Sequence, residues 1–297
     1  MRVFITGATG WIGSATVAEL LRSGHTVSGL ARSDASAAKL AALGADAVRG
    51  DLDAPDTLRR GAAAADAVVH LANKHDWNDP QGNDRSERRA VEAMLDALAG
   101  TGKPFAIANG LSGIVEGRAA LETDASPAWG AGSDRGGSEN LVLESAGIGV
   151  RSIAVRFAPS VHGRGDWGFV DWLTAAARRH GVSGYVGDGG AQWSAVHVGD
   201  AARLIRLGLE SAPAGTRLHA VAEQTISTRA IAEAIGASLG LPVRSIEPAR
   251  VEAHFGVVGH FFARSLTGSS ERTRQRLSWT PTGPGLIEDI LAGAYTD

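Results

Sequence analysis

Three glycines near the amino terminus have the spacing of a phosphate-binding turn. Gly7, Gly10 and Gly13 follow the apolar run Arg2–Thr6 and open a segment with helical periodicity. The first glycine permits a tight turn, the second lets the backbone approach a pyrophosphate, and the third lets the helix pack against the strand. Amides and the helix dipole then bind the phosphates. The pattern predicts a dinucleotide site. The residues expected to form it are Gly7, Thr9, Gly10, Trp11, Ile12 and Gly13.

The residues after the second predicted strand distinguish between two dinucleotides. An Asp or Glu there usually accepts hydrogen bonds from the ribose hydroxyls of NAD. This chain has Arg32 and Ser33 instead, followed by Asp34. A guanidinium offers a planar fork of donors to a 2′-phosphate, so we expect NADP(H), with Arg32 and Ser33 contacting that phosphate. Alternatively, Arg32 is solvated and Asp34 caps the next helix, or Asp34 accepts from the ribose of NAD(H).

Short apolar runs alternate with helical patterns through the first half of the chain. This alternation predicts an α/β fold with a doubly wound parallel sheet, the Rossmann fold. The expected strands are Arg2–Thr6, Thr26–Ala31, Ala45–Arg49, Ala67–Ala72, Pro104–Asn109 and Arg151–Phe157. The expected helices are Trp11–Ser23, Asp34–Leu43, Pro55–Ala62, Asn83–Ala99 and Ser133–Ser145.

The pattern changes after Phe157, where loops become rich in Gly and Trp. Helical stretches are expected near Gly168–His180, Val198–Glu210 and Thr228–Leu239. No low-complexity linker separates the two halves. We therefore expect a dinucleotide-binding Rossmann domain over residues 1–157, and a smaller α/β substrate-binding region over residues 158–297 packed closely on it.

Composition excludes several classes of function. The chain has 297 residues, a formal net charge of -3 and no cysteine, which excludes disulfides, thiolate metal sites and a Cys nucleophile. No histidine pair has metal-ligand spacing with a carboxylate, so no metal is expected. No long basic run points to nucleic acid or an anionic membrane, and no apolar run reaches the roughly 20 residues that span a bilayer. The first residues have the pattern of a strand and not of a signal peptide. A cytoplasmic protein that acts on a small molecule is expected.

Several further motifs resemble those of the extended short-chain dehydrogenase/reductases, the group that includes the NAD-dependent epimerase/dehydratase-like proteins. They are Gly50-Asp51-Leu52, Val68–Asn73, Val196–Ala202 and Leu277–Pro281, and the resemblance covers nearly the whole chain. Dimers are common in this family, which makes a homodimer one expectation. The resemblance implies further cofactor contacts at the adenine, the inner channel and the nicotinamide end. Asp51 and Leu52 would contact the adenine, and Leu71, Ala72 and Asn73 would line the inner channel. Phe157, Pro159 and Ser160 would contact the nicotinamide end.

The family's usual catalytic residues are absent from the matching positions. That chemistry uses Ser or Thr and a Tyr-x-x-x-Lys motif, in which Tyr transfers the carbonyl proton and Lys lowers the pKa of Tyr. Here Asn109 stands in place of Ser, Arg135 in place of Tyr and Glu139 in place of Lys. Arg135 and Glu139 lie four residues apart and are expected to pair on one helix face. The chain resembles an atypical branch of the family.

Replacement catalytic groups are expected in loops near the pocket. His75 follows the fourth strand and His162 follows the sixth, and histidine exchanges protons near neutral pH. Either one is alternatively an ordinary hydrogen-bonding loop residue. The candidates for catalysis are Asn109, His75, His162 and Arg135. Aromatic walls would suit an apolar substrate. The residues expected to contact substrate are Trp77, Ser112, Trp167 and Trp193.

Three functions remain open at this point. A missing general acid costs about 10²–10⁴-fold, and the hydride comes from the cofactor. An iminium is already protonated, so the favoured function is an NADP(H)-dependent reductase of an imine or activated carbonyl in a small, largely apolar substrate. The second is a non-catalytic NADP(H) sensor, as in the NmrA-like regulators. The third is nucleotide-sugar epimerase or dehydratase chemistry.

Overall fold

The core of the protein is a seven-stranded parallel sheet. The computed structural model describes residues 1–74, 76 and 78–296. The strands lie in the order β10-β6-β5-β4-β1-β2-β3. Their bounds are β1 Arg2–Thr6, β2 Thr26–Ala31, β3 Asp46–Arg49, β4 Ala67–His70, β5 Pro104–Gly110, β6 Arg151–Phe157 and β10 Thr216–Ala220. All neighbouring pairs are parallel, which confirms the predicted doubly wound sheet.

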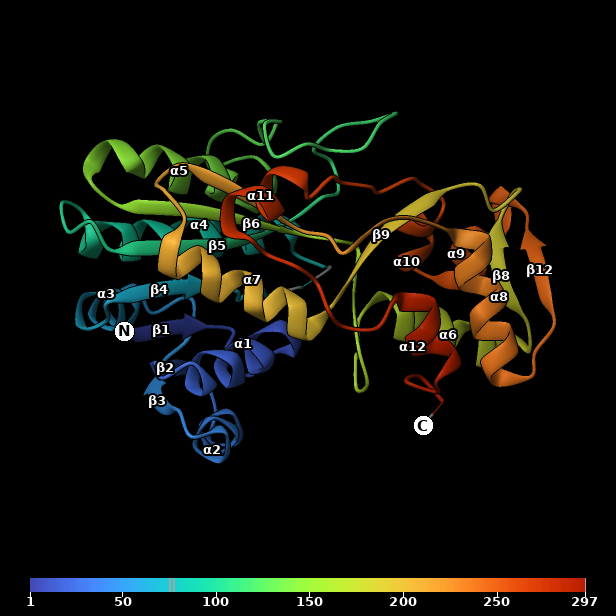
Figure 1. Ribbon diagram of the computed structural model, residues 1–297, viewed down its shortest axis with the longest axis horizontal. Coiled ribbons are helices and arrows are strands. Elements are labelled where there is room, and N and C mark those ends of the chain that lie inside the picture. Colours follow the sequence, from blue (N-terminus) through green and yellow to red (C-terminus); the bar gives the residue numbers. More distant parts are fainter. Residues whose placement is uncertain (75, 77, 297) are drawn as a thin grey trace.

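Helices cover both faces of this sheet (Figure 1). One face buries an apolar cluster that includes Val17, Leu20 and Leu204, and the other a cluster that includes Leu58 and Met94. The helices of the first face are α1 Trp11–Arg22, α2 Asp34–Leu43 and α7 Val198–Ser211. Those of the second are α3 Pro55–Ala64, α4 Pro80–Leu98 and α5 Ser138–Glu144.

The chain leaves the sheet after β6 and returns to it. Strand β10 pairs with β6 as the outermost strand, and α7 leads into it after packing against α1. The sheet therefore takes its last strand from beyond residue 157. The main sheet is therefore not confined to residues 1–157, the range expected for the dinucleotide-binding domain, because it also includes β10.

A smaller lobe with its own core lies beside the sheet (Figure 1). It holds the three-stranded sheet β11-β9-β7 and the pair β12-β8. Its strands are β7 Ser160–His162, β8 Ser183–Val186, β9 Gln192–His197, β11 Glu223–Ser227 and β12 Val243–Ile246. Its helices are α6 Phe169–His180, α8 Thr228–Leu239, α9 Val251–Phe255, α10 Val258–Phe262 and α12 Leu286–Leu291. Among the described residues, no helix combines the length and apolar character needed to cross a membrane.

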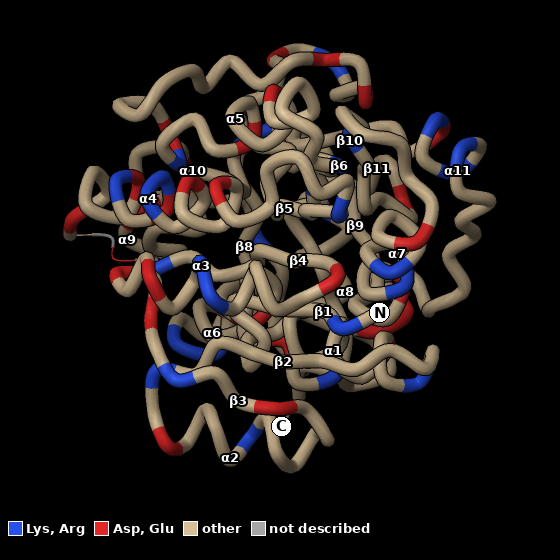
Figure 2. The backbone as a smooth tube through the Cα atoms, turned by 90° about the vertical axis from the view of Figure 1, so that its left-hand side faces the viewer, with Lys and Arg blue, Asp and Glu red and all other residues tan. Residues whose placement is uncertain are grey.

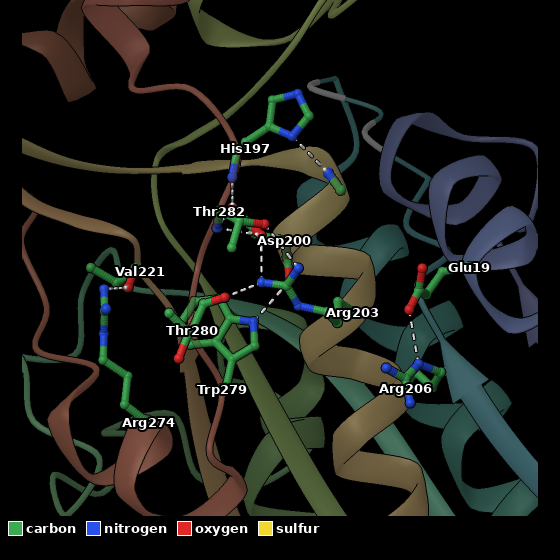
Figure 3. A network of polar contacts seen from close by, with 12 residues as sticks. Glu19, His197, Asp200, Arg203, Arg206, Val221, Arg274, Trp279, Thr280 and Thr282 are labelled. Carbon is green, nitrogen blue, oxygen red and sulfur yellow. Dashed lines mark hydrogen bonds and ion pairs between the residues drawn. The ribbon is translucent and has the colours of Figure 1, made fainter. Parts of the chain in front are cut away.

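A polar network fixes the carboxyl-terminal segment to α7 (Figure 3). Asp200, which is buried, accepts hydrogen bonds from the amides of Thr282 and Gly283 at 2.8–3.1 Å and from Arg203 at 2.8 Å. The indole of Trp279 donates to the Asp200 carbonyl at 3.1 Å. Asp200 and Trp279 belong to the two family-like motifs of the second half, so these two motifs pack against each other beside the main sheet.

Candidate functional site

The carboxyl ends of the parallel strands bring the expected cofactor residues to one edge. Gly7 follows β1, Arg32 follows β2 and Leu71 follows β4, while Asn109 and Phe157 lie at the ends of β5 and β6. Open α/β sheets bind their ligands outside this edge. The residues predicted from sequence therefore lie along one line, which a dinucleotide can follow from β3 to β6.

The glycine turn leaves no room for side chains. Gly7 has φ +71°, and a Cβ there would lie 2.7 Å from the amide nitrogen of Ala72. A Cβ on Gly13 would lie 2.0 Å from the carbonyl oxygen of Gly7. Gly10 precedes α1 without a side-chain cap, and the first turn of α1 carries no acidic residue. The first amides of this helix thus remain available to an anion, and the turn fits a pyrophosphate.

The end of β2 presents two cations. Arg32 is exposed and makes no hydrogen bond or ion pair with any described residue. Lys39, on the second turn of α2, donates from Nζ to the carbonyl oxygen of Thr9 at 2.7 Å. Sequence reasoning missed Lys39, although its place in the second turn of the helix after the second strand was a usable signal. Both cations lie beside the glycine turn.

Ser33 and Asp34 have other partners in this structure. Ser33 caps α2, because its hydroxyl accepts from the amide of Ser36 at 3.2 Å. Asp34 forms an ion pair with Arg49 at 2.7 Å. Ser33, and not Asp34, is therefore the N-cap of α2, and its hydroxyl is already engaged in this hydrogen bond.

The remaining adenine and inner-channel residues differ in exposure. Asp51 is exposed and accepts from the amide of Asp53 at 2.9 Å, and Leu52 is buried beside it. The Ala72 amide donates to the hydroxyl of Thr6 at 3.4 Å. The contact between Ala72 and Thr6 holds the segment after β4 close to the glycine turn, whereas the contact of Asp51 lies within the loop after β3.

The helix expected over residues 133–145 is shorter than predicted. α5 begins only at Ser138, after a 3₁₀ turn in which Arg135 has φ +53°. Gly136 and Gly137 adopt the left-handed conformation that glycine favours, and this ends the helical path. The expected pairing of Arg135 with Glu139 on one helix face is therefore wrong.

Arg135 is paired with a carboxylate of α4 instead. Its Nη2 donates to Glu87 Oε1 at 2.6 Å, and its Nη1 donates to the Ala108 carbonyl at 2.8 Å. Burial raises the pKa of Glu87, but the charges of Arg135 and His70 outweigh burial and lower it to about 2. A guanidinium fixed against a carboxylate is unsuited to donate a proton.

Asn109 and Glu139 belong to a second buried cluster. Asn109 Nδ2 donates to Glu139 Oε2 at 2.5 Å, and its Oδ1 accepts from the Gly110 amide at 2.8 Å. Glu139 is held by Arg156, which is fully buried and donates to Oε1 at 2.6 Å. Burial opposes the charge on Glu139, yet Arg156 brings the pKa of this carboxyl below its ordinary value. Sequence spacing gave no signal for Glu87 or Arg156, because both lie far along the chain.

His162 is enclosed by protein. Its ring is fully buried, Nδ1 lies 2.6 Å from Asp289 Oδ2, and the ring packs edge-on against His197 at 5.7 Å between centroids. Burial lowers the pKa of His162 below its ordinary value. The structure gives this side chain no surface for a substrate, which argues against the direct catalytic role considered for it. His75 and Trp77 lie outside the described residues.

The tryptophans divide between surface and core. Trp167 is 58% exposed in the loop before α6. Trp193 is fully buried; its indole donates to the Phe261 carbonyl at 3.2 Å and its ring packs against Phe262. Trp193 was expected to contact substrate, but it lies in the core of the smaller lobe because it packs against apolar residues there.

Residues after β6 connect the turn with the smaller lobe. The Trp11 indole donates to the Val161 carbonyl at 2.6 Å, so the start of α1 is fixed to β7. Ser160 is buried, and its hydroxyl has no hydrogen-bond partner among the described residues. Ser112 is exposed after β5. Within the described ranges, no group of three His, Cys, Asp or Glu residues is arranged to hold a metal ion.

The parallel sheet, the glycine turn at its carboxyl edge and the adjoining lobe define a class of dinucleotide-binding α/β proteins. The chain belongs to the NAD-dependent epimerase/dehydratase family, whose profile matches residues 3–106, and the resemblance drawn from the motifs is confirmed. An uncharacterized protein of Saccharomyces cerevisiae is 43% identical over 298 residues, covering 98% of each chain.

Two further proteins are similar to this chain. A 4-hydroxy-2-methyl-3-oxo-4-farnesyl-3,4-dihydroquinoline-1-oxide ketoreductase of Stigmatella aurantiaca is 27% identical over 226 residues, covering 72% of this chain and 66% of that protein. The crystal structure of Thermus thermophilus UDP-glucose 4-epimerase in complex with NAD has a TM-score of 0.77 and 22% identity, covering 99% of this chain and 98% of that one. The latter likeness shows the shared fold.

Proposed function

We propose that this protein is an NADP(H)-dependent reductase of a C=N bond or an activated C=O bond in a small, largely apolar substrate. The proposal rests on two neighbouring features, a glycine turn that fits a pyrophosphate and a positively charged side chain at the end of β2. The glycine turn at Gly7 and Gly13 fits a pyrophosphate, and Arg32, beside it, has no partner among the described residues. NADPH supplies the hydride when bound.

The preference for NADP(H) rests on charge at the end of β2. Within the described part of the chain no group occupies the donors of Arg32, and the ammonium of Lys39 donates to the Thr9 carbonyl in the turn. Asp34, the residue that could instead accept from the ribose of NAD, is engaged with Arg49. Two cations and an occupied carboxylate favour a 2′-phosphate over free ribose hydroxyls.

The preference for an imine or activated carbonyl rests on the missing proton donor. Asn109 carries no ionisable proton, Arg135 stays charged, and Glu139 is held ionised by Arg156. A substrate that needs little help from an acid suffers least from such a site. The similarity to a ketoreductase whose named substrate is a farnesylated quinoline oxide supports reduction of an apolar compound.

The test follows NADPH consumption against a panel of cyclic imines, activated ketones and simple ketones, with NADH as the control cofactor. Turnover of imines or activated ketones with NADPH, and little turnover of simple ketones, is the expected result. Equal turnover of all ketones would contradict the substrate class. Faster turnover with NADH would contradict the role of Arg32.

The second candidate is a non-catalytic NADP(H) sensor. It is favoured by the engagement of Arg135 and Glu139 in buried ion pairs, which leaves neither free to act on a substrate. NADPH binding measured by fluorescence, with no turnover of any compound in the panel, would favour the sensor. Nucleotide-sugar chemistry needs a base at these positions, so the same pairs weigh against it.

A further inference from the structure

A groove with three arginines lies at the outer edge of the main sheet. Its volume is about 240 Å³, which is smaller than the roughly 300–1,000 Å³ of most small-molecule pockets. Every residue that lines it is charged, polar or glycine. They are Glu122 and Thr123 after β5, Gly215, Thr216 and Arg217 at the start of β10, and Arg272 and Arg276 of α11 (Glu271–Leu277).

The groove is separate from the dinucleotide turn. β10 is the last strand of the sheet, and β6, β5 and β4 lie between it and β1. The groove is lined by the amino end of β10, whereas the glycine turn lies at the carboxyl end of β1. Figure 2 shows the basic positions of α11 at the margin of the molecule, beyond β10. A ligand here would not share the cofactor's site.

The three guanidinium groups have hydrogen-bond donors to spare. Arg272 is exposed and has no hydrogen bond or ion pair with a described residue. Arg276 donates from Nη1 to the neutral hydroxyl of Thr216 at 3.0 Å, its one hydrogen bond to residues that the structure describes. Arg217 Nε lies 3.4 Å from Glu139 Oε1, an oxygen that Arg156 already holds at 2.6 Å.

One carboxylate also lines the groove and offsets one of these charges. Glu122 is buried, and its Oε1 accepts from the amide and the hydroxyl of Thr273 at 2.8 and 2.9 Å. Among the residues that line the groove, three guanidinium groups thus outnumber one carboxylate, and only Arg217 of the three also contacts a carboxylate outside it, that of Glu139. Guanidinium groups match the geometry of phosphate oxygens and bind them with paired donors.

We propose that this groove is a second ligand site, which binds a small phosphate-bearing anion. Arg272 and Arg276 supply the exposed charge, and Arg217 supplies the inner donor. Since Arg217 also contacts Glu139, an anion in the groove would compete with the carboxylate that orients Asn109.

The test is titration calorimetry with inorganic phosphate, on the full chain saturated with NADPH so that the turn is filled. The comparison is between the wild type, the double variant Arg272→Ala/Arg276→Ala, and Arg60→Ala. Arg60 is a matched control, because it is exposed and donates to a threonine hydroxyl, Thr57, at 3.1 Å. We expect the double variant to bind phosphate at least tenfold more weakly and the control to bind it unchanged.

Several results would overturn the proposal. They are equal phosphate affinity in the double variant, an equal response to sodium chloride at matched ionic strength, or tighter binding of citrate than of phosphate. Circular dichroism checks that the double variant is folded. If it is not, the single variants Arg272→Gln and Arg276→Gln are compared in its place, and each is expected to weaken phosphate binding. The site needs no turnover, so its failure is distinct from failure of the proposed reductase.

Discussion

Arg135 and Glu139, which the family resemblance matches to the usual tyrosine and lysine, are each paired with an oppositely charged side chain. Arg135 is paired with Glu87, and Glu139 with Arg156, at 2.6 Å in each case. A buried pair contributes little net stability compared with apolar residues, but removing one partner leaves an uncompensated charge. Changes at these positions should therefore appear in the free energy of unfolding as well as in activity.

Replacing Glu139 tests this directly. Glu139→Gln removes the negative charge beside fully buried Arg156, and we expect the free energy of unfolding to fall by about 3–5 kcal/mol. Urea denaturation followed by tryptophan fluorescence measures the change. Glu144→Gln, at an exposed position of the same helix, is the control and should stay within about 0.5 kcal/mol of the wild type. Similar values for the two variants would mean that the pair is already solvated.

Arg32 is the residue on which cofactor choice depends. Arg32→Ala removes donors to the 2′-phosphate, and a charge-assisted hydrogen bond contributes about 1.5–3 kcal/mol. The KM for NADPH, or its Kd if there is no turnover, should rise about ten- to a hundredfold, whereas the value for NADH should stay the same. Arg22→Ala, at the far end of α1, serves as the control. An equal rise of the KM or Kd for NADPH and NADH would contradict a contact between Arg32 and the 2′-phosphate.

The elements show what could be predicted from sequence. The six strands of the first half were found within two residues of their ends, because apolar runs bounded by glycine and polar residues are local signals. The helix over 133–145 was extended too far, because the Gly136–Gly137 pair interrupts its start. The partners of Arg135 and Glu139 come from α4 and β6. Only tertiary packing brings those residues together, so sequence spacing did not reveal them.

The glycine turn gives a prediction about an element. Gly13→Ala places a methyl group 2.0 Å from the Gly7 carbonyl oxygen, so α1 and β1 must separate. We expect a loss of about 1–3 kcal/mol in the free energy of unfolding, together with weaker NADPH binding. Gly147→Ala is the control, because a Cβ there meets nothing within 4 Å. Denaturation and fluorescence titration measure the two effects. An unchanged Gly13→Ala variant would contradict the close helix–strand approach.

At the scale of the whole molecule, the carboxyl-terminal segment is fixed to the loop after β7 by a titrating group. Tyr295 donates to Asp166 Oδ2 at 2.9 Å, and the Gly168 amide donates to Oδ1 at 2.7 Å. Burial raises the pKa of Asp166 to about 6, even though both hydrogen bonds favour the ionised form. Ionisation of this carboxyl therefore works against the folded state.

The sign of the resulting pH dependence follows from this shift. The folded pKa lies above the ordinary value of 3.8, so the stability from Asp166 is complete below that value and is lost as pH rises through about 6. The loss is at most about 3 kcal/mol. The Asp166→Asn side chain stays neutral at both pH values. The Tm of the variant, relative to that of the wild type, should therefore be higher at pH 7 than at pH 5. Thermal unfolding at the two pH values measures it, and a constant difference would contradict the raised pKa.

The return of the chain to the sheet at β10 affects how the protein is made. A ribosome releases β6 well before β10, so the nascent sheet ends in an unpaired edge while the small lobe is synthesised. Unpaired edges of parallel sheets recruit other chains, and large proteins aggregate from such intermediates. The Rossmann part cannot finish folding until residue 220 has emerged. Newly made chains should therefore depend on chaperones longer than those of a protein whose sheet is built from one continuous segment.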